Sequence, residues 1–578
     1  MAAANTYLGL YAGMTVSASI PAAVISMGIL RGFFRRGTIL ENNIIQTAAS
    51  AGESLAAGII FTIPALVIVG AWLEFDFWVT SLVALLGGLL GVLFMIPLRK
   101  ALIVEEKELI YPEGVACAEV LKTGEEQQSG RAKHIFIPLG LGFAFKFFVT
   151  AFSVIKGTVE KAGMIGKSLF YFGSDCSVAL LGVGYIVGFN VSVLVFMGGA
   201  LGWLLGIPIY SLFNPATGDL LESAWNIWSH EIRFLGVGAM IVGGIWSIIS
   251  IKEGIKKGLT ELFGKFQSTD DLPKRIIFPL LSGIIVAIFF LYWHILGTPG
   301  ISLIAALLMV IAAFFFVAVS SYIVGLVGSS NNPVSGMIIS TLLFTSAIIL
   351  LIGMTGVKGM IAALVIAGVV GCATCTAGDV SQDLKTGWLV GATPRRQQIV
   401  QIIGIVAASF IITPILTLLN NAYGIGTGEP GALQAPQASL FASIAKGLFA
   451  KGGELPWNMV LIGGALAVIL ILIDEFLKRQ KSSFRTYVMP VAVGIYLPLS
   501  LSVPILIGGI IRKSIKKAGK GILVSSGLIA GEALAGVVIA GMIYIGFTPK
   551  TIIQSNPFSL FVFIGFIAYL FLIDRLSR

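Results

Sequence analysis

Charged residues are scarce in this sequence. Asp, Glu, Lys and Arg make up 11% of its 578 residues, whereas hydrophobic residues make up 57%. None of the four charged types occurs between Ile276 and Val357. That run is long enough for three or four membrane crossings at roughly 20 apolar residues each. Too few polar residues remain for a soluble domain, so the composition predicts an all-α, polytopic helical membrane protein.

Histidine and cysteine are also rare. The sequence has three histidines, none in an HExxH motif, which excludes a zinc protease of that type. Of the four cysteines, Cys372 and Cys375 form a CxxC pair with no second pair, so neither a disulfide framework nor a metal site is predicted. The segment 163–168 ends like a nucleotide-binding loop but lacks its first glycine. We therefore expect no enzyme, no cofactor and no bound metal.

Positive charge is present in modest excess. There are 38 Lys and Arg against 28 Asp and Glu, which gives a net charge of +10. The excess lies in short loops between apolar runs, as positive-inside sorting requires, rather than in an arm that could follow nucleic acid. We expect a multi-pass membrane protein with lipid around it and no nucleic-acid partner.

The apolar runs predict about 14 to 16 transmembrane helices, divided into an N-terminal half (1–275) and a C-terminal half (276–578) of one integral membrane unit. Pro21 predicts a break in the first run, because proline leaves a backbone carbonyl without its helical partner. The glycine-rich run 177–209 also predicts an interrupted helix. Since the basic loops cannot all lie on one side if every run crosses once, at least one run is expected to be re-entrant.

The sequence also contains internal repeats, and in multi-pass membrane proteins such repeats can indicate where a binding site lies. Residues 17–21 (SASIP) match 500–504 (SLSVP), and residues 51–56 (AGESLA) match 530–535 (AGEALA). Glu53 therefore has a counterpart in Glu532. A further match pairs the glycines and serine of 184–201 with those of the segment that begins at Gly494.

Glu53 is an ionisable residue within an apolar run. At about 100° per residue, Asn43, Gln46, Ser50 and Glu53 fall on one helix face. Charged residues inside a membrane cost several kcal/mol and normally face a partner or a water-filled cavity. The alternative is that Glu53 is a structural hydrogen-bonding group among small residues that serve helix packing.

Two other polar clusters interrupt apolar sequence. Asn331, Asn332 and Ser335 surround a proline, and a helix beginning there would aim free amides at a carboxylate group. A tight turn between two crossings explains the same residues. Asp379 and Asp383 share a helix face and could form a proton site, an ion pair or a helix-end cap. We interpret Asp383 as structural and leave the role of Asp379 open.

Three segments carry a resemblance to a known family: ENNIIQTAASAGESLAAGIIFTIPAL (41–66), YPEGVACAEVLKTGE (111–125) and AGDVSQDLKTGWLVGATPRRQQ (377–398). They resemble the oligopeptide transporter (OPT) family, in particular its bacterial and yellow-stripe-like members. The NPG and KIPPR signatures of the fungal and plant peptide-transporting branch do not occur.

The resemblance implies a secondary transporter of the bacterial inner (plasma) membrane, a proton symporter that imports short peptides or metal complexes of small amino-acid-like chelators. The candidates for proton coupling are Glu53, Glu532 and Asp379. The candidates to line the substrate path are polar residues of two of the clusters: Asn43, Gln46, Ser50, Glu53, Asn331, Asn332 and Ser335. A channel, or a structural membrane protein whose polar residues only pack helices, is the alternative. The sequence leaves open whether the chain forms a homo-oligomer.

Overall fold

A computed structural model of the chain describes most of its residues. They are residues 1–575 except 14, 16, 33, 35–36, 107–108, 127–132, 153–154, 216–217, 251–269, 330–331, 333, 428–431, 451–455, 483, 516–518 and 548–555. The predicted Asn331 lies outside this set.

Helices dominate the structure. Those of the N-terminal part are α1 (Ala2–Ala12), α2 (Ser19–Gly32), α3 (Ile39–Ile68), α4 (Phe77–Arg99), α5 (Pro112–Glu126), α6 (Lys133–Thr150), α7 (Val178–Ala200), α8 (Ile207–Phe213), α9 (Leu220–Ile227) and α10 (Arg233–Ser250), with short π-helices η1 (Lys100–Glu105), η2 (Leu201–Gly206) and η3 (Trp228–Ile232). The later ones are α12 (Lys274–Leu296), α13 (Pro299–Val327), α14 (Val334–Leu351), α15 (Gly356–Val390), α16 (Pro394–Tyr423), α17 (Pro436–Phe449), α18 (Trp457–Arg479), α19 (Val488–Tyr496), α20 (Leu499–Lys513), α21 (Gly519–Tyr544) and α22 (Asn556–Arg575).

Ten of the described helices are long and apolar enough to cross a membrane, and three shorter ones are also apolar. The prediction of a polytopic helical membrane protein is therefore confirmed. The ten long helices are fewer than the 14 to 16 expected, because several apolar runs fold as two short helices around a break. Pro21 illustrates this, since it lies in the first turn of α2, after the end of α1, where a missing amide costs little.

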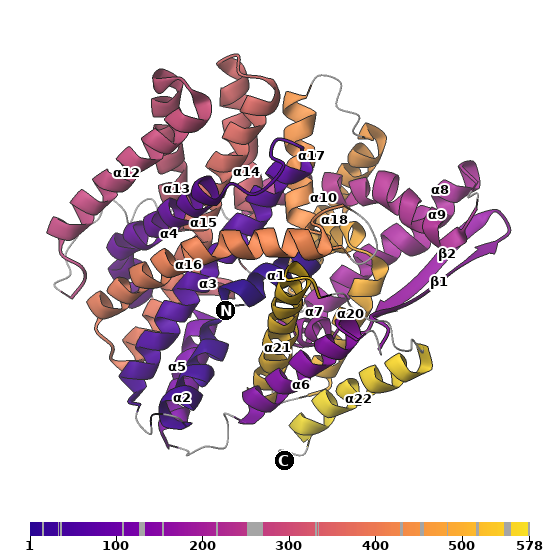
Figure 1. Ribbon diagram of the computed structural model, residues 1–578, viewed down its shortest axis with the longest axis horizontal. Helices are drawn as coiled ribbons and strands as arrows, with labels where there is room; N and C mark the ends of the chain where they lie inside the picture. The colour runs from indigo at the N-terminus through magenta and orange to yellow at the C-terminus, as the bar shows by residue number, and fades with distance from the viewer. Residues whose placement is uncertain are drawn as a thin grey trace.

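The helices form two groups, seen side by side in Figure 1. Helices α2–α5 pack with α12–α17 in one group, and α6–α10 pack with α18–α22 in the other. The helix α1 contacts both, through α3 and α21. The division of the chain at residue 275 stays a prediction, and each group takes helices from both sides of it.

The helix α15 forms the centre of the first group and is buried along most of its length. Glycines let the neighbouring helices approach it closely: a Cβ atom at Gly87 of α4 would lie 2.5 Å from the carbonyl oxygen of Val369, and one at Gly58 of α3 would lie 2.7 Å from the sulfur of Cys372. Small residues at membrane helix interfaces serve this purpose. The polar residues of α15 are consequently held inside the protein.

Two interrupted helices, α7 and the pair α19–α20, form the corresponding centre of the second group. Gly188 breaks α7, with φ of 84° and ψ of 172°, a conformation that glycine adopts without a Cβ clash. Pro498 stands at the interruption between α19 and α20. The sequence offset between these two positions equals the offset between the first residues of α7 and α19, Val178 and Val488. The break predicted in 177–209 is therefore present, and it is repeated.

Glycine contacts between these helices are reciprocal. A Cβ atom at Gly184 would clash with the carbonyl of Ile505, and one at Gly494 would clash with the carbonyl of Val195. Gly494 follows Gly184 at the offset that relates the two breaks, and Ile505 follows Val195 at the same offset. A second pair of contacts follows the same rule: a Cβ atom at Gly198 would clash with the carbonyl of Val491, and one at Gly508 would clash with the carbonyl of Leu181. The predicted match between 184–201 and the segment from Gly494 therefore corresponds to a local pseudo-two-fold axis.

A β-hairpin, which the all-α prediction did not include, precedes α7. Strands β1 (Thr158–Ile165) and β2 (Ser168–Asp175) pair antiparallel around a turn at Gly166, whose φ is 63°. The loop-like segment 163–168 is the tip of this hairpin. A phosphate-binding loop leads from a strand into a helix, so this segment has a different fold.

Candidate functional site

The predicted polar stripe on α3 is buried. The helix begins at a capping box, in which the Thr38 side chain accepts the amide of Glu41 and the Glu41 side chain accepts the amide of Thr38. This start sets the rotation of the helix. Asn43, Gln46 and Ser50 then face the interior with no exposed surface.

These residues belong to a hydrogen-bond network centred on Asp383 of α15. Asn43 donates to Gln46 over 3.2 Å, and Gln46 donates to Oδ1 of Asp383 over 2.5 Å. Ser50 lies 3.0 Å from Ser19, which donates to the same oxygen over 3.0 Å. The network ties together α2, α3 and α15. Among the described residues, Oδ2 of Asp383 has no hydrogen-bond partner.

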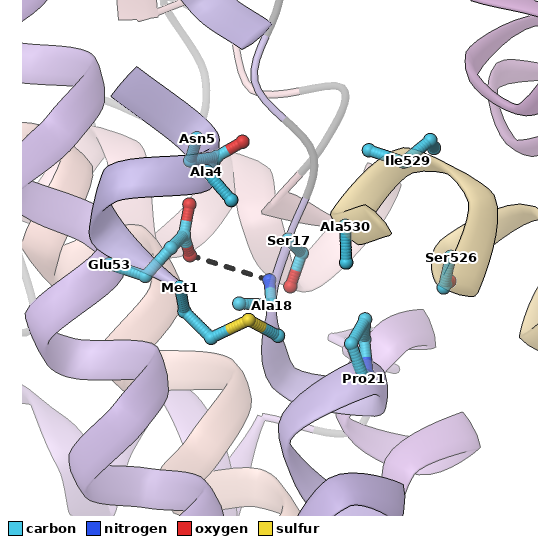
Figure 2. Close-up of a pocket in the computed structure, with 10 residues that line it drawn as sticks. All are labelled: Met1, Ala4, Asn5, Ser17, Ala18, Pro21, Glu53, Ser526, Ile529 and Ala530. Atoms are coloured by element: carbon cyan, nitrogen blue, oxygen red, sulfur yellow. Dashed lines mark hydrogen bonds between the residues drawn. The ribbon is translucent and has the colours of Figure 1, made fainter. Parts of the chain in front are cut away.

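Glu53 lies one turn beyond this network and is 4% exposed. Its carboxylate accepts the backbone amide of Ala18 over 3.3 Å, at the start of α2. It also lines a small cavity of about 40 Å³ between α1, α2 and α21, and Figure 2 shows Asn5 above the carboxylate and Ala530 on the facing helix. In the part of the chain that the structure describes, no lysine or arginine forms an ion pair with Glu53.

Asp379 faces the interruption between α13 and α14. It accepts a hydrogen bond from the Ser329 hydroxyl, and the Ser329 amide donates to Glu113 of α5 over 3.1 Å. Asn332 donates to Ser320 over 2.7 Å. The predicted Asn332 therefore lies against α13, and its Oδ1 is buried without a described partner. Two acidic side chains, Glu113 and Asp379, accept the donors of Ser329 at this break.

A polar cavity larger than the one beside Glu53 lies around Glu532 of α21. It has a volume of about 340 Å³ and is bordered by α1, α6, β1, β2, α9, α16, α20 and α21. Glu532 accepts the Ser177 hydroxyl over 2.8 Å and the Ala179 amide over 2.7 Å, at the start of α7. Glu53 and Glu532 thus share a surrounding: each follows a glycine and accepts an amide where another helix begins.

Asp175 is the second carboxylate of this cavity. Its Oδ2 accepts the Tyr11 hydroxyl over 2.6 Å, and its Oδ1 accepts the Ser177 amide over 2.8 Å. Burial raises the pKa of Asp175 to about 6, with the neighbouring carboxylate of Glu532 acting in the same direction; the Tyr11 hydrogen bond and the positive charge of Lys146 act against this increase.

Lys146 of α6 supplies the positive charge that lines the cavity. Its Nζ lies 5.7 Å from the ring centre of Tyr7 and 5.6 Å from that of Tyr11. Tyr423 closes the wall from α16 and donates to the carbonyl of Gly536 over 2.8 Å. At the rim, Glu160 accepts the Tyr171 hydroxyl over 2.9 Å and also lines the cavity. Charges of both signs therefore face one cavity.

Most of the site residues predicted from the sequence lie away from this cavity. Of the predicted residues, Glu532 lines it, whereas Asn43, Gln46, Ser50, Asn332 and Ser335 line neither polar cavity. Sequence reasoning missed Lys146 and Asp175. A lone lysine in the apolar run 135–155 carries the same signal as Glu53, since intramembrane charges are expensive.

Three features together define a class of protein. The helices have breaks inside apolar runs, buried carboxylates lie at those breaks, and a cavity is lined by charges of both signs. These features are typical of multi-pass membrane proteins of the transporter type. A family model described as "OPT oligopeptide transporter protein" matches residues 1–543. The chain belongs to the OPT family of transporters and is not an enzyme.

Individual relatives agree with this assignment. A Haemophilus influenzae protein named as a candidate oligopeptide transporter is 36% identical over 93% of this chain and 92% of its own length. The iron-phytosiderophore transporter yellow stripe 1 of Zea mays is 25% identical over 87% of this chain and 79% of its own. The metal-nicotianamine transporter YSL3 of Arabidopsis thaliana is 25% identical over 77% and 70%. The chain is thus similar to proteins named for two kinds of substrate.

Proposed function

We propose that this protein is a secondary active transporter of the bacterial inner membrane. It imports short oligopeptides, or metal complexes of small amino-acid-like chelators, together with protons. The relatives' names support these two substrate classes, and the buried carboxylates of the chain support coupling to protons.

The observation that carries the proposal is the surrounding of Glu53. A carboxylate inside the membrane normally faces a cationic partner or a water-filled cavity. Glu53 forms no ion pair with a lysine or arginine among the described residues and faces a cavity of about 40 Å³, large enough for water. Met1 also lines this cavity, and its terminal ammonium interacts electrostatically with Glu53. A carboxyl group there can take up a proton from water on one side of the membrane. It can stay neutral while the protein changes conformation, and then release the proton to the other side.

The position of Glu53 also suits coupling. Its amide donor, Ala18, precedes α2 at an interruption between two short helices. In transporters, interrupted helices place binding groups where rigid parts move relative to one another. A change in the charge of Glu53 would alter its bond to this interruption, and therefore the cost of moving α2 relative to α3.

Uptake into liposomes tests the proposal. The purified protein is reconstituted, an inward proton gradient is imposed, and uptake of a tripeptide pool is compared with uptake of iron and nickel chelates. We expect saturable, gradient-driven uptake of one class, and its loss in Glu53→Gln. The matched control is Glu41→Gln, which makes the same chemical change at an exposed position of the same helix and keeps a capping side chain.

Two results would contradict the proposal. Uptake that does not saturate and ignores the gradient would indicate a channel. Gradient-driven uptake that persists in Glu53→Gln would return Glu53 to a structural role.

A further inference from the structure

The cavity of about 340 Å³ has the composition of a binding site rather than of a packing defect. Its volume lies at the lower end of the range of about 300–1,000 Å³ that is typical of small-molecule sites. It also lies where the two helix groups meet, because Tyr7, Tyr11 and Tyr423 come from α1 and α16, and Lys146 and Glu532 come from α6 and α21. A ligand held there would contact both groups at once.

Hydrogen bonds hold the Asp175 and Glu532 carboxylates of the cavity in place. Each oxygen of Glu532 accepts one hydrogen bond from the start of α7. Oδ2 of Asp175 accepts the hydroxyls of Tyr11 and Thr158, and its Oδ1 accepts the Ser177 amide. Each carboxylate oxygen has two acceptor sites. One acceptor site therefore remains on Oδ1 of Asp175 and on each oxygen of Glu532, and these sites can accept a cationic group at positions that the protein has already set.

The opposite charge comes from Lys146, whose ammonium lies beside the rings of Tyr7 and Tyr11. The three donors of an ammonium group suit a ligand carboxylate. With Glu160 at the rim, the cavity has three acidic side chains against this one lysine. The balance disfavours a ligand that carries only negative charge.

We propose that this cavity binds the substrate as a small zwitterion, with its free ammonium group at Asp175 and Glu532 and its free carboxylate at Lys146. This inference rests on the proposed transport function and assigns the chemical class of its substrate. The tyrosine rings form the wall along the ligand backbone, where planar amide groups can pack on aromatic faces. The volume restricts the ligand to the length of a short peptide or of a comparable amino-acid chelator.

Direct binding to the purified full-length protein tests the site without transport. The probe is radiolabelled tri-alanine, in competition with unlabelled tri-alanine, N-acetyl-tri-alanine and tri-alanine amide. We expect each blocked peptide to compete about 10- to 100-fold less well, the effect of losing one charged hydrogen-bonded end. Equal competition by all three peptides would overturn the proposal.

Variants assign the two ends of the ligand. Lys146→Gln should abolish the preference for tri-alanine over its amide and keep the preference over the N-acetyl form. Asp175→Asn should abolish the preference over the N-acetyl form and keep the preference over the amide. Lys161→Gln, an exposed change on β1, is the control and should keep both preferences. If Lys146→Gln retains the full preference for a free carboxylate, the assignment is wrong. The end-group preference of the unaltered protein tests the site even where a variant fails to fold.

A binding measurement with nickel–nicotianamine distinguishes a peptide ligand from a metal–chelator ligand. In the nickel complex the metal occupies amine groups that are free in a peptide. Binding of tri-alanine but not of the nickel complex supports a peptide source. Binding of the nickel complex alone would overturn the requirement for a free ammonium group. Selective binding of zwitterions without gradient-driven uptake would leave this site standing and defeat the proposed function.

Discussion

Replacing either Gly184 or Gly494 with alanine should destabilise the protein by a similar amount. At both positions a Cβ atom would clash with a backbone carbonyl of the facing helix, at Ile505 and Val195 respectively. A backbone atom cannot move aside as a side chain can, so the two helices must separate. Overpacking of this kind costs about 1–3 kcal/mol, and the better helix propensity of alanine offsets about 1 kcal/mol. We expect a net loss of up to about 2 kcal/mol in each variant.

Thermal unfolding in detergent, followed by circular dichroism, measures the effect. The control is Gly283→Ala on α12, where a Cβ atom would meet nothing within 4 Å. That variant should be unchanged or more stable, opposite in sign to the other two. Stability of Gly184→Ala equal to that of Gly283→Ala would refute the close packing. A large loss in only one of Gly184→Ala and Gly494→Ala would refute the equivalence of the two contacts.

Two further predictions concern charged groups. Because the pKa of Asp175 is raised to about 6, Asp175 loses its charge as the pH falls from 7 to 5, and tri-alanine should then bind about tenfold more weakly. Titration calorimetry should show this weakening in the unaltered protein, whereas Asp175→Asn should remove it. Arg99→Met should destabilise the protein by about 3–5 kcal/mol, since it leaves the buried Asp271 without its ion pair of 2.6 Å. Adding Asp271→Leu should recover most of that loss, and a double variant no more stable than Arg99→Met in thermal unfolding would contradict this account.

The sequence predicted those parts of the fold that depend on local pattern. Apolar runs indicated the membrane helices, and glycine or proline within them indicated the breaks at Pro21 and in 177–209. The repeat around Gly494 could be matched by residue type, because small residues at close helix contacts cannot be replaced freely. The hairpin β1–β2 was missed, since its strands are short and too mixed in polarity to show a clear alternation.

The site was predicted less completely, for a physical reason. Glu53 and Glu532 are recognisable because a charge within an apolar run is costly wherever it lies. Tyr7, Tyr11 and Tyr423 look like ordinary residues of membrane segments, and only the packing of α1 and α16 brings them to one cavity. Asp175 precedes an apolar run and reads as a loop residue until β2 carries it inward. Which distant segments meet depends on tertiary packing, which helical periodicity does not encode.

The helix α1 contributes to the lining of both polar cavities, with Asn5 beside Glu53 and Tyr7 and Tyr11 beside Asp175. A ligand and a proton that each bind more tightly to one placement of α1 are thermodynamically linked. If protonation of Glu53 strengthens ligand binding by some factor, the ligand must strengthen proton binding by the same factor. This short helix would then make the occupancy of one cavity depend on the occupancy of the other, without direct contact between the proton and the ligand.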